Sequence, residues 1–343
     1  MRIFVNASNM HVGGGNVLLV DFLGAASTLK NIEFIVFVDE RFQIPLEAGG
    51  NIIFKKIFKA LRWRVSPLIE KQTTKNDIVI YLTNIPPMKK HKCKTILVQS
   101  NRFLIDYFSL EGFSLKTKIR ITFERLLFWQ NNKNADYIIV QSESMSTILK
   151  KKGINETKIK VFAYKNKEKV NNKKDLSANY EKPKNRFLYI ASDEPHKNHK
   201  NLIEAWCLLS KNNIFPKLTI TININTNLHQ FILNKIGYYK LDVEIIPNMK
   251  RKDILNLYNR STALIFPSFF ESYGLPMVEA VQHGIPVIAA ELDYVRDIID
   301  PVETFDPNSP KSIFRSIKRF LEIDEKKTVI YSPLDFIESM MSL

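Results

Sequence analysis

Short apolar segments alternate with amphipathic segments along this chain, and the alternation occurs twice. In the first half, apolar runs occupy residues 2–6, 33–38, 51–54, 77–82, 94–98 and 136–141, and the clearest helical pattern between them is at 114–131. In the second half they occupy 186–191, 217–223, 242–246, 262–266 and 286–290, with helical patterns at 200–211 and 274–283. Strands that alternate with helices favour a parallel sheet with helical crossovers. The sequence therefore predicts two successive α/β units.

A polar segment separates the two halves. Residues 164–185 are charged and nearly free of apolar side chains, which is typical of a linker. We therefore expect an N-terminal domain at 1–165, a linker at 166–185 and a C-terminal domain at 186–325. Residues 326–343 are expected to form a C-terminal tail, and its return to the N-terminal domain is a hypothesis.

Length and composition fit a chain with a substantial core in a reducing compartment. It has 343 residues, 45% of them hydrophobic, which is enough for about two domains. Its two cysteines, Cys93 and Cys207, are far apart and lack partners at metal-ligand spacing, so neither a disulfide framework nor a zinc site is expected. We also expect no signal peptide and no transmembrane helix, because the N-terminal residues resemble a strand and no apolar run approaches about 18 residues. These features favour a cytoplasmic location.

The net charge of +15 is concentrated in the middle of the chain. Residues 51–200 contain 32 Lys and Arg against 13 Asp and Glu. Such a block attracts phosphates, nucleic acid or an anionic membrane surface, although a biased surface composition is an equally simple explanation. Nucleic acid is the weakest of these partners, because no helix-turn-helix or RNA-binding motif accompanies the charge.

The most informative segment is 262–297. Its apolar strand ends at Phe266, a short loop follows, and a helix begins near Gly274 or Leu275 and stops at Gly284. Ligands of open α/β sheets bind at the carboxyl ends of strands, which is where this loop lies. The free amides at the start of the helix offer a seat for a phosphate group.

Two glutamates frame this strand–loop–helix unit. Glu271 lies in the loop, and Glu279 lies eight residues later in the helix. From these positions Glu271 would reach the mouth of a binding site, and Glu279 could contact a hydroxyl-rich ligand such as a ribose. The alternative is that Glu271 caps the helix and Glu279 is a solvated helix residue.

The residues around the glutamates favour the binding interpretation. Residues 266–289, FPSFFESYGLPMVEAVQHGIPVIA, resemble the signature of the retaining glycosyltransferases of family 4, with its E-x7-E pair. The resemblance implies the GT-B fold, in which two Rossmann-like parallel-sheet domains face each other across a cleft. It also implies that Glu271 contacts the donor sugar, as a catalytic residue, and that Glu279 contacts the nucleotide ribose. The donor-binding set would further include Ser272, Tyr273, Gly274 and Leu275.

Residues 188–206, LYIASDEPHKNHKNLIEAW, resemble a second donor segment of the family. There a lysine before the helix holds the diphosphate, and the spacing assigns that role to Lys197, whose charge would stabilise the departing nucleoside diphosphate. Many family members place an arginine where this chain has Ala191. His196 or Lys200 could replace that cation, so we include Ala191 and His196 in the donor site. A solvated basic loop is the alternative.

Two N-terminal segments are expected to line the cleft. Gly14 and Gly15 follow the first strand without forming a G-x-G-x-x-G motif, so a tight turn would explain them as well. In the family, a glycine loop at this place lies near donor and acceptor. Gln99, Asn101 and Arg102 follow another strand and could face the cleft, where some family members use a histidine.

No metal site is expected. The chain lacks a cluster of His, Cys, Asp or Glu at metal-ligand spacing, and it lacks the D-x-D motif of metal-dependent transferases. We therefore expect no cofactor other than the nucleotide-sugar co-substrate.

Together these features predict a retaining glycosyltransferase that moves a sugar from a nucleotide-sugar donor to a glycan or polyprenyl-linked acceptor. By resemblance, the pathway would be the assembly of a bacterial surface polysaccharide such as O-antigen or capsule. Two alternatives remain open: a nucleotide-sugar epimerase of related fold, and a non-catalytic protein that binds sugar or lipid.

Two basic segments suggest contact with a membrane. Residues 54–65 and 116–129 combine cations with aromatic and aliphatic side chains. Such segments can lie on anionic membrane surfaces, so peripheral binding at the inner face of the cytoplasmic membrane is a hypothesis. The alternative is an ordinary helix that packs its apolar face inward.

Overall fold

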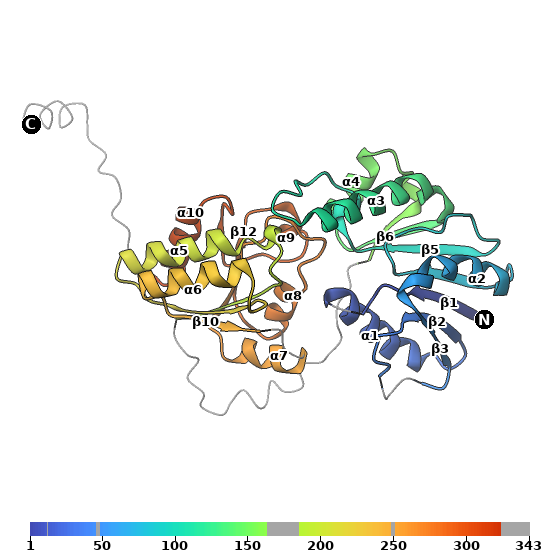
Figure 1. The fold of residues 1–343 in the computed structure, drawn as a ribbon, viewed down its shortest axis with the longest axis horizontal. Helices are drawn as coiled ribbons and strands as arrows, with labels where there is room; N and C mark the ends of the chain where they lie inside the picture. The colour runs from blue at the N-terminus through green and yellow to red at the C-terminus, as the bar shows by residue number, and fades with distance from the viewer. Residues whose placement is uncertain (12, 46–48, 163–184, 248–250, 324–343) are drawn as a thin grey trace, which may run out of the picture.

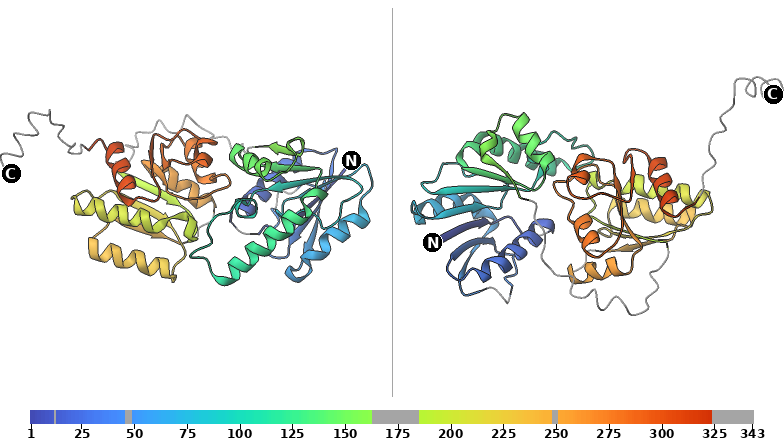
Figure 2. Two further views of the ribbon diagram at one scale, coloured as in Figure 1. Left: turned by 90° about the horizontal axis from the view of Figure 1, so that it is seen from above. Right: turned by 180° about the vertical axis from the view of Figure 1, so that it is seen from behind.

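The computed structural model describes residues 1–11, 13–45, 49–162, 185–247 and 251–323, except for the side chains of 251 and 252. Within these residues the chain forms a seven-stranded and a six-stranded sheet. Figures 1 and 2 show the two sheets in separate domains that lie side by side. Every strand pair is parallel, as the alternating pattern predicts.

The N-terminal sheet has the strand order β3-β2-β1-β4-β5-β6-β7. Its strands are β1 (Arg2–Ala7), β2 (Glu33–Asp39), β3 (Ile52–Ile57), β4 (Ile78–Tyr81), β5 (Lys94–Gln99), β6 (Tyr137–Val140) and β7 (Ile159–Val161). Helix α1 (Gly13–Thr28) covers one face, because Ile3 and Val5 of β1 share a core with its Leu19 and Leu23. Phe4 points the other way, into a core shared with α2 (Val65–Gln72), α3 (Leu115–Asn131) and α4 (Glu143–Lys151).

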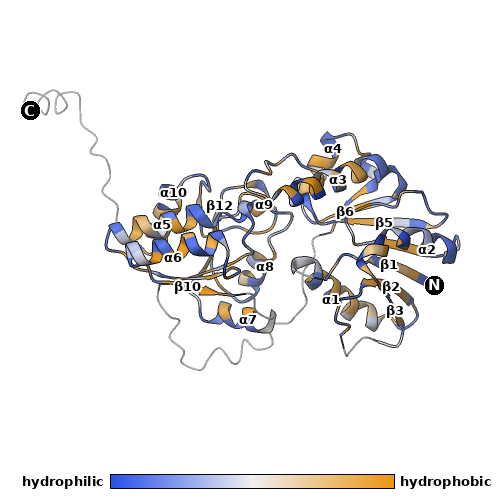
Figure 3. Cartoon of the chain, viewed as in Figure 1, coloured by the Kyte–Doolittle hydropathy of each residue, from blue (hydrophilic) through white to orange (hydrophobic). Residues whose placement is uncertain are grey.

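The C-terminal sheet has the order β10-β9-β8-β11-β12-β13. Its strands are β8 (Arg186–Ile190), β9 (Lys217–Thr221), β10 (Val243–Ile246), β11 (Ala263–Phe266), β12 (Val287–Ala290) and β13 (Glu303–Phe305). Its helices are α5 (His199–Lys211), α6 (Asn227–Tyr239), α7 (Arg251–Asn259), α8 (Leu275–Gln282), α9 (Asp293–Arg296) and α10 (Pro310–Phe320). One hydrophobic cluster fills this domain, with Tyr189 and Trp206 among its largest fully buried side chains. Figure 3 shows hydrophobic colouring along the strands of both sheets.

All eleven predicted strands and the three predicted helices are present, with ends that shift by up to three residues. The short strands β7 and β13 were missed, because three residues carry too little pattern to identify a strand. Nearly all of the predicted linker and the whole predicted tail lie outside the described residues, so the domain boundaries stay predictions. Cys93 and Cys207 are free, buried thiols.

The carboxyl ends of the two sheets face each other. Arg102 follows β5 and donates from Nη1 to the Glu271 carbonyl oxygen at 3.4 Å, and Glu271 follows β11. Ser142 follows β6 and donates from Oγ to the carbonyl oxygen of Ser272 at 3.4 Å. Because all strands within each sheet are parallel, these contacts bring both ligand-binding edges together.

Candidate active site

Lys197 and Glu271 meet at the carboxyl edge of the C-terminal sheet. Lys197 ends a 3₁₀ turn, η6 (Pro195–Lys197), that follows β8, and its Nζ lies 2.7 Å from Glu271 Oε1. Only 18% and 12% of the two side chains are exposed. The Tyr189 hydroxyl fixes the turn by donating to the Lys197 carbonyl oxygen at 2.6 Å. Neither alternative from the sequence holds, because Lys197 is not a solvated basic residue and Glu271 binds a cation instead of capping α8.

The start of α8 retains the features of an anion seat. Its N-cap residue, Gly274, has a φ of 76° and no side chain to accept from the first amides. A Cβ at this position would lie 2.4 Å from Cε at the end of the flexible Met277 side chain, so the positive φ is the stronger reason for glycine here. The neighbouring Tyr273 is buried, which raises the pKa of its hydroxyl, and Leu275 begins the helix.

Glu279 is buried and not solvated, which excludes the alternative drawn from the sequence. It is 7% exposed, and its Oε2 accepts a hydrogen bond from the Tyr258 hydroxyl at 3.0 Å. Tyr258 belongs to α7 and is itself fully buried. This tyrosine escaped the sequence analysis, because nothing in its surroundings indicates that α7 packs against α8.

His196 supplies no second cation. Its ring lies between Phe103, at 5.0 Å, and Phe113, at 5.9 Å, both from the N-terminal domain. Burial, together with the charge of Lys197, lowers the pKa of His196 to about 3, so the ring is neutral near pH 7. At Ala191, where the family places an arginine, the backbone amide donates to Thr221 Oγ1 at 3.0 Å.

Arg102 brings a cation to the Glu271 loop from the other domain. Besides its contact with the Glu271 carbonyl oxygen, its Cζ lies 4.7 Å from the Phe270 ring centroid. Asp106 pairs with the same guanidinium at 3.1 Å. The sequence analysis predicts that Arg102 faces the cleft, and in the structure Arg102 lies beside the loop that contains Glu271.

Gln99 and Asn101 shape the loop that carries Arg102. Gln99 is fully buried and donates from Nε2 to the Asn101 carbonyl oxygen at 2.8 Å. The Asn101 side chain accepts from the Phe103 amide at 3.1 Å and so begins the short 3₁₀ helix η2 (Arg102–Leu104). Both side chains therefore position this loop.

Gly14 and Gly15 form the first turn of α1. An added Cβ would meet no atom within 4 Å at Gly14, whereas at Gly15 it would lie 3.5 Å from Met10 Cε. Gly14 thus borders open space at the carboxyl edge of the N-terminal sheet.

In the described part of the chain, no group of three or more His, Cys, Asp or Glu side chains could hold a metal, and no helix is long and apolar enough to span a membrane.

Comparison with known sequences identifies the C-terminal region. Residues 170–332 match the family described as glycosyl transferases group 1. The chain is 28% identical over 149 residues to the serotype-specific mannosyltransferase WbdA of Escherichia coli. This alignment covers 41% of this chain and 18% of WbdA. The chain is also 25% identical over 146 residues to the O-antigen chain mannosyltransferase B of Escherichia coli. This second alignment covers 41% of this chain and 38% of that relative. The matches thus span less than two fifths of these relatives.

Solved structures match over nearly the whole chain. WaaG, a glycosyltransferase involved in lipopolysaccharide biosynthesis, superposes with a TM-score of 0.66 at 15% identity, over 94% of this chain and 90% of WaaG. Anabaena HepE in complex with UDP superposes with a TM-score of 0.63 at 17% identity, over 94% of this chain and 90% of HepE. At such identities these likenesses establish the fold, which is the GT-B arrangement expected from the sequence. Residues 170–332 are therefore similar to a glycosyltransferase group 1 domain, and the chain has the GT-B fold.

Proposed function

We propose that this chain is a retaining glycosyltransferase that moves a sugar from a nucleotide-sugar donor to a glycan or lipid-linked acceptor. The observation that carries the proposal is the Lys197–Glu271 pair at the carboxyl edge of the sheet in the group 1 domain. A cation and a carboxylate in contact, next to a helix N-terminus, suit a ligand that combines a diphosphate with a sugar.

The roles of these groups follow from their charges. Lys197 and the first amides of α8 would bind the diphosphate and stabilise the charge that develops as it leaves. Glu271 would then accept hydrogen bonds from hydroxyls of the donor sugar, and Glu279 would accept from the ribose. We assign no metal to the site, because a lysine and helix amides can neutralise the leaving group without one.

The acceptor would bind against the N-terminal domain. Its hydroxyl would attack from the face that the diphosphate leaves, and the leaving phosphate would take its proton, so that the anomeric configuration is retained. Closure of the domains would align the acceptor and exclude water, which limits hydrolysis of the donor. Arg102 supports this arrangement, because it already links the two domains beside Glu271.

The names of relatives and neighbours suggest the pathway. Several are mannosyltransferases of O-antigen, and WaaG acts in lipopolysaccharide biosynthesis. We therefore place this chain in the assembly of a bacterial surface polysaccharide on the cytoplasmic side of the membrane.

The test has two stages. First, thermal unfolding is followed with UDP, GDP, dTDP and ADP, because a ligand that binds only the native state raises the unfolding midpoint. Nucleotide sugars of the stabilising base are then supplied with candidate acceptors, and the anomeric configuration of the product is read by NMR. Transfer with retention supports the proposal. Inversion would refute the mechanism, and epimerisation of the donor without transfer would refute the function.

We further propose that α3 rests on an anionic membrane surface. Its outward face exposes Leu115, Ile119, Phe123 and Leu126, by 74%, 62%, 59% and 52%. Its inward face buries Ile121 and Phe128, so the helix has a second apolar stripe that no described residue covers. Lys116, Lys118 and Arg120 lie beside that stripe, and cations flanking exposed apolar residues match the interface of an anionic bilayer.

The other basic segment does not form one amphipathic helix. Residues 54–57 belong to β3, and Phe54 packs against the core. The remainder forms the 3₁₀ helix η1 (Lys59–Arg64), around which Phe58 and Trp63 are 62% and 66% exposed. Only this second part is available to a membrane. The 3₁₀ helix η1 directly precedes α2 in the sequence. Helices α2 and α3 pack against the same face of the N-terminal sheet.

A further inference from the structure

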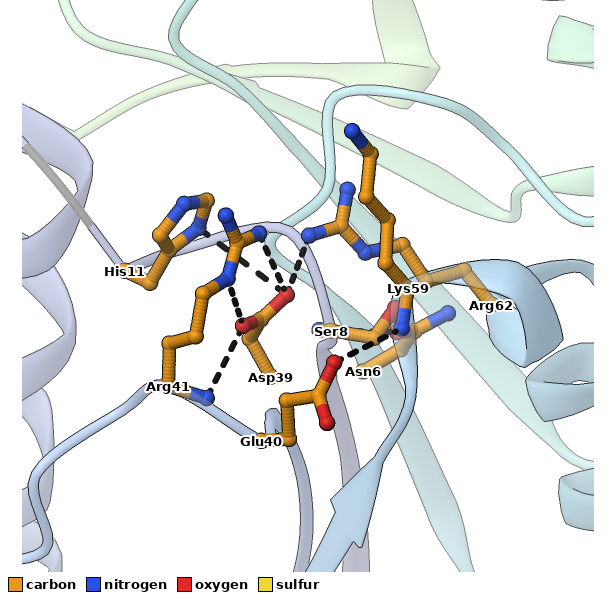
Figure 4. Close-up of polar contacts among 8 residues, drawn as sticks. All are labelled: Asn6, Ser8, His11, Asp39, Glu40, Arg41, Lys59 and Arg62. Carbon is orange, nitrogen blue, oxygen red and sulfur yellow. Dashed lines mark hydrogen bonds and ion pairs between the residues drawn. The ribbon is translucent and has the colours of Figure 1, made fainter.

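Two arginines converge on one buried carboxylate at the carboxyl edge of the N-terminal sheet (Figure 4). Asp39 is the last residue of β2 and is fully buried. Arg41, two residues later, donates to it from Nε at 2.7 Å and from Nη2 at 3.1 Å. Arg62 of η1 donates to the same carboxylate from Nη2. Three separate parts of the backbone, the end of β2, the loop after it and η1, are thus tied together.

Two guanidinium groups share one buried carboxylate at the centre of the cluster. The guanidinium groups hold the pKa of Asp39 well below its usual range, chiefly through the Arg41 hydrogen bonds, so the carboxylate stays ionised near pH 7. The Asp39 carboxylate therefore faces two guanidinium groups, and the neighbouring Glu40 adds a second negative charge that acts on Arg41. Arg41 and Arg62 remain 49% and 26% exposed, so solvent or a ligand reaches both.

Two buried nitrogen atoms of the cluster lack a hydrogen-bond partner among the described residues. Arg62 Nε is buried, and no described residue accepts a hydrogen bond from it. His11 Nδ1 is also buried without a hydrogen-bond partner among the described residues, 4.0 Å from Asp39 Oδ2. Each guanidinium has five N–H donors, and Asp39 uses only some of them. The exposed parts of the two guanidinium groups therefore retain N–H groups that a phosphate could accept from.

A second arginine–carboxylate pair on the same sheet shows what a purely structural pair looks like. At the opposite edge, Arg2 donates to Asp77 from Nε at 3.1 Å and Nη2 at 2.7 Å. Thr74 supplies the other contacts to Asp77, through its amide at 2.7 Å and its hydroxyl at 2.9 Å. There one carboxylate binds one arginine, and the neutral Thr74 groups complete the site. Asp39 instead holds an additional cation.

The position of the cluster fits the acceptor. It lies at the carboxyl edge of the N-terminal sheet, as does Gly14, and this edge faces the domain that contains Lys197 and Glu271. The donor diphosphate already has its seat on that other domain. An anion bound by Arg41 and Arg62 would therefore belong to a second substrate.

We propose that Arg41 and Arg62, oriented by Asp39, bind a phosphate or diphosphate group of the acceptor. The inference rests on the proposed function and deepens it, because it names the chemistry by which the acceptor is recognised. The anionic group could come from a lipid-diphosphate headgroup or from a water-soluble phosphate, and both would satisfy the same donors.

The test uses calorimetric binding of three probes to the full chain: farnesyl diphosphate, inorganic diphosphate and the uncharged alcohol farnesol. The main variant is Arg62→Gln, which leaves Arg41 paired with Asp39 so that no buried carboxylate is stranded. Arg62→Lys retains the charge without the planar fork. Arg2→Gln is the control at the opposite edge, where the amide and hydroxyl of Thr74 still donate to Asp77 after the arginine is removed. Lys197→Ala removes the lysine that we assign to the donor diphosphate.

We expect wild type, Arg2→Gln and Lys197→Ala to bind farnesyl diphosphate, and Arg62→Gln to bind it about tenfold or more weakly, as the loss of one charge-assisted contact implies. The affinity of Arg62→Lys for farnesyl diphosphate should lie between the affinities of wild type and Arg62→Gln. Tighter binding of farnesyl diphosphate than of inorganic diphosphate would identify a lipid headgroup, and equal binding would identify a free phosphate.

The proposal is overturned if Arg62→Gln and Arg2→Gln bind alike, if farnesol binds as tightly as its diphosphate, if wild type binds neither diphosphate, or if Lys197→Ala alone abolishes binding. Failure of the proposed function is a separate result. In that case no nucleotide sugar would support transfer, while the dependence of diphosphate binding on Arg62 would persist in the Lys197→Ala background.

Discussion

Lys197 Nζ and Glu271 Oε1, which lie 74 residues apart in the sequence, are 2.7 Å apart in the fold. More than four fifths of each side chain is buried. Removing two charges from water is costly, and a buried pair is often no more stable than apolar residues of similar size. The pair is therefore better explained by binding than by stability, since an arriving diphosphate can compete for the lysine and release the carboxylate for the sugar.

Replacement of this lysine should slow transfer strongly. Lys197→Ala removes the charge opposite the leaving diphosphate, and we expect kcat to fall about a hundredfold or more. The matched control is Lys211→Ala, which removes an exposed lysine from the last turn of α5 and should leave kcat unchanged. Steady-state rates of nucleoside diphosphate release with acceptor present give the comparison. Equal rates for the two variants would contradict the assignment of Lys197.

Removal of the Tyr258 hydroxyl should weaken binding of the nucleoside more than binding of the phosphates. Tyr258→Phe takes away a donor to Glu279, which we assign to the ribose, and the carboxylate loses one constraint on its orientation. We expect affinity for the matching nucleoside diphosphate to fall about fivefold, close to the value of one hydrogen bond. Affinity for inorganic diphosphate should not change. Calorimetry with both ligands separates these effects, and parallel losses would argue against a ribose role for Glu279.

Gly14→Ala should stabilise the fold and impair activity. The added methyl group meets no protein atom, and alanine favours a helix over glycine by about 1 kcal/mol. If a substrate approaches this turn closely, kcat/KM should nevertheless fall about tenfold or more. Gly24→Ala in the same helix also meets no atom and is the control. Urea denaturation should show a gain in both variants, larger for Gly24→Ala in the helix interior than for Gly14→Ala in the first turn. Unchanged activity in Gly14→Ala would remove this turn from the site.

His199 should make the fold sensitive to mild acid. Its ring is buried near Tyr189, neither nitrogen has a hydrogen-bond partner among the described residues, and burial lowers its pKa to about 3. As pH falls below about 6.5, the unfolded chain takes up a proton at this position and the native state does not, so the free energy of unfolding falls by about 1.4 kcal/mol per pH unit.

His199→Leu removes that contribution. Urea denaturation from about pH 7.5 to about pH 5, a range above the ordinary pKa of aspartate, should give a shallower pH dependence for the variant than for wild type. The variant should also gain stability at neutral pH, because two unsatisfied buried nitrogens disappear. Identical slopes would show that His199 titrates normally in the native state.

Polar substitutions on α3 should release the protein from membranes. Ile119 and Phe123 are 62% and 59% exposed, so an Ile119→Ser/Phe123→Ser variant should fold normally and lose flotation with vesicles of anionic lipid. Phe215→Ser removes an aromatic residue that is 53% exposed on the C-terminal domain, and it should float like wild type. Wild-type protein that stays unbound at physiological salt would refute the membrane proposal.

The fold could be predicted from the sequence because each buried strand is a short apolar run. The alternation of apolar and amphipathic segments occurs once in each half of the chain, which indicates two domains. The Glu271 loop could be predicted as well, since residues 266–289 carry a family signature. The Asp39 cluster could not, although polar residues follow the strand at 33–38, because nothing in the chain indicates that Arg62, 23 residues away, meets that carboxylate. The Tyr258–Glu279 contact depends in the same way on how α7 packs against α8. Such pairings are set by tertiary packing.

The central claim is that the donor diphosphate binds between Lys197 and the start of α8. It is tested most directly by a crystal structure of the chain with the nucleoside diphosphate that stabilises it most. We predict phosphate oxygens within hydrogen-bond distance of Lys197 Nζ and the first amides of α8, with the ribose at Glu279. A nucleotide bound elsewhere, with the Lys197–Glu271 contact intact and Glu279 still enclosed by protein, would contradict the account.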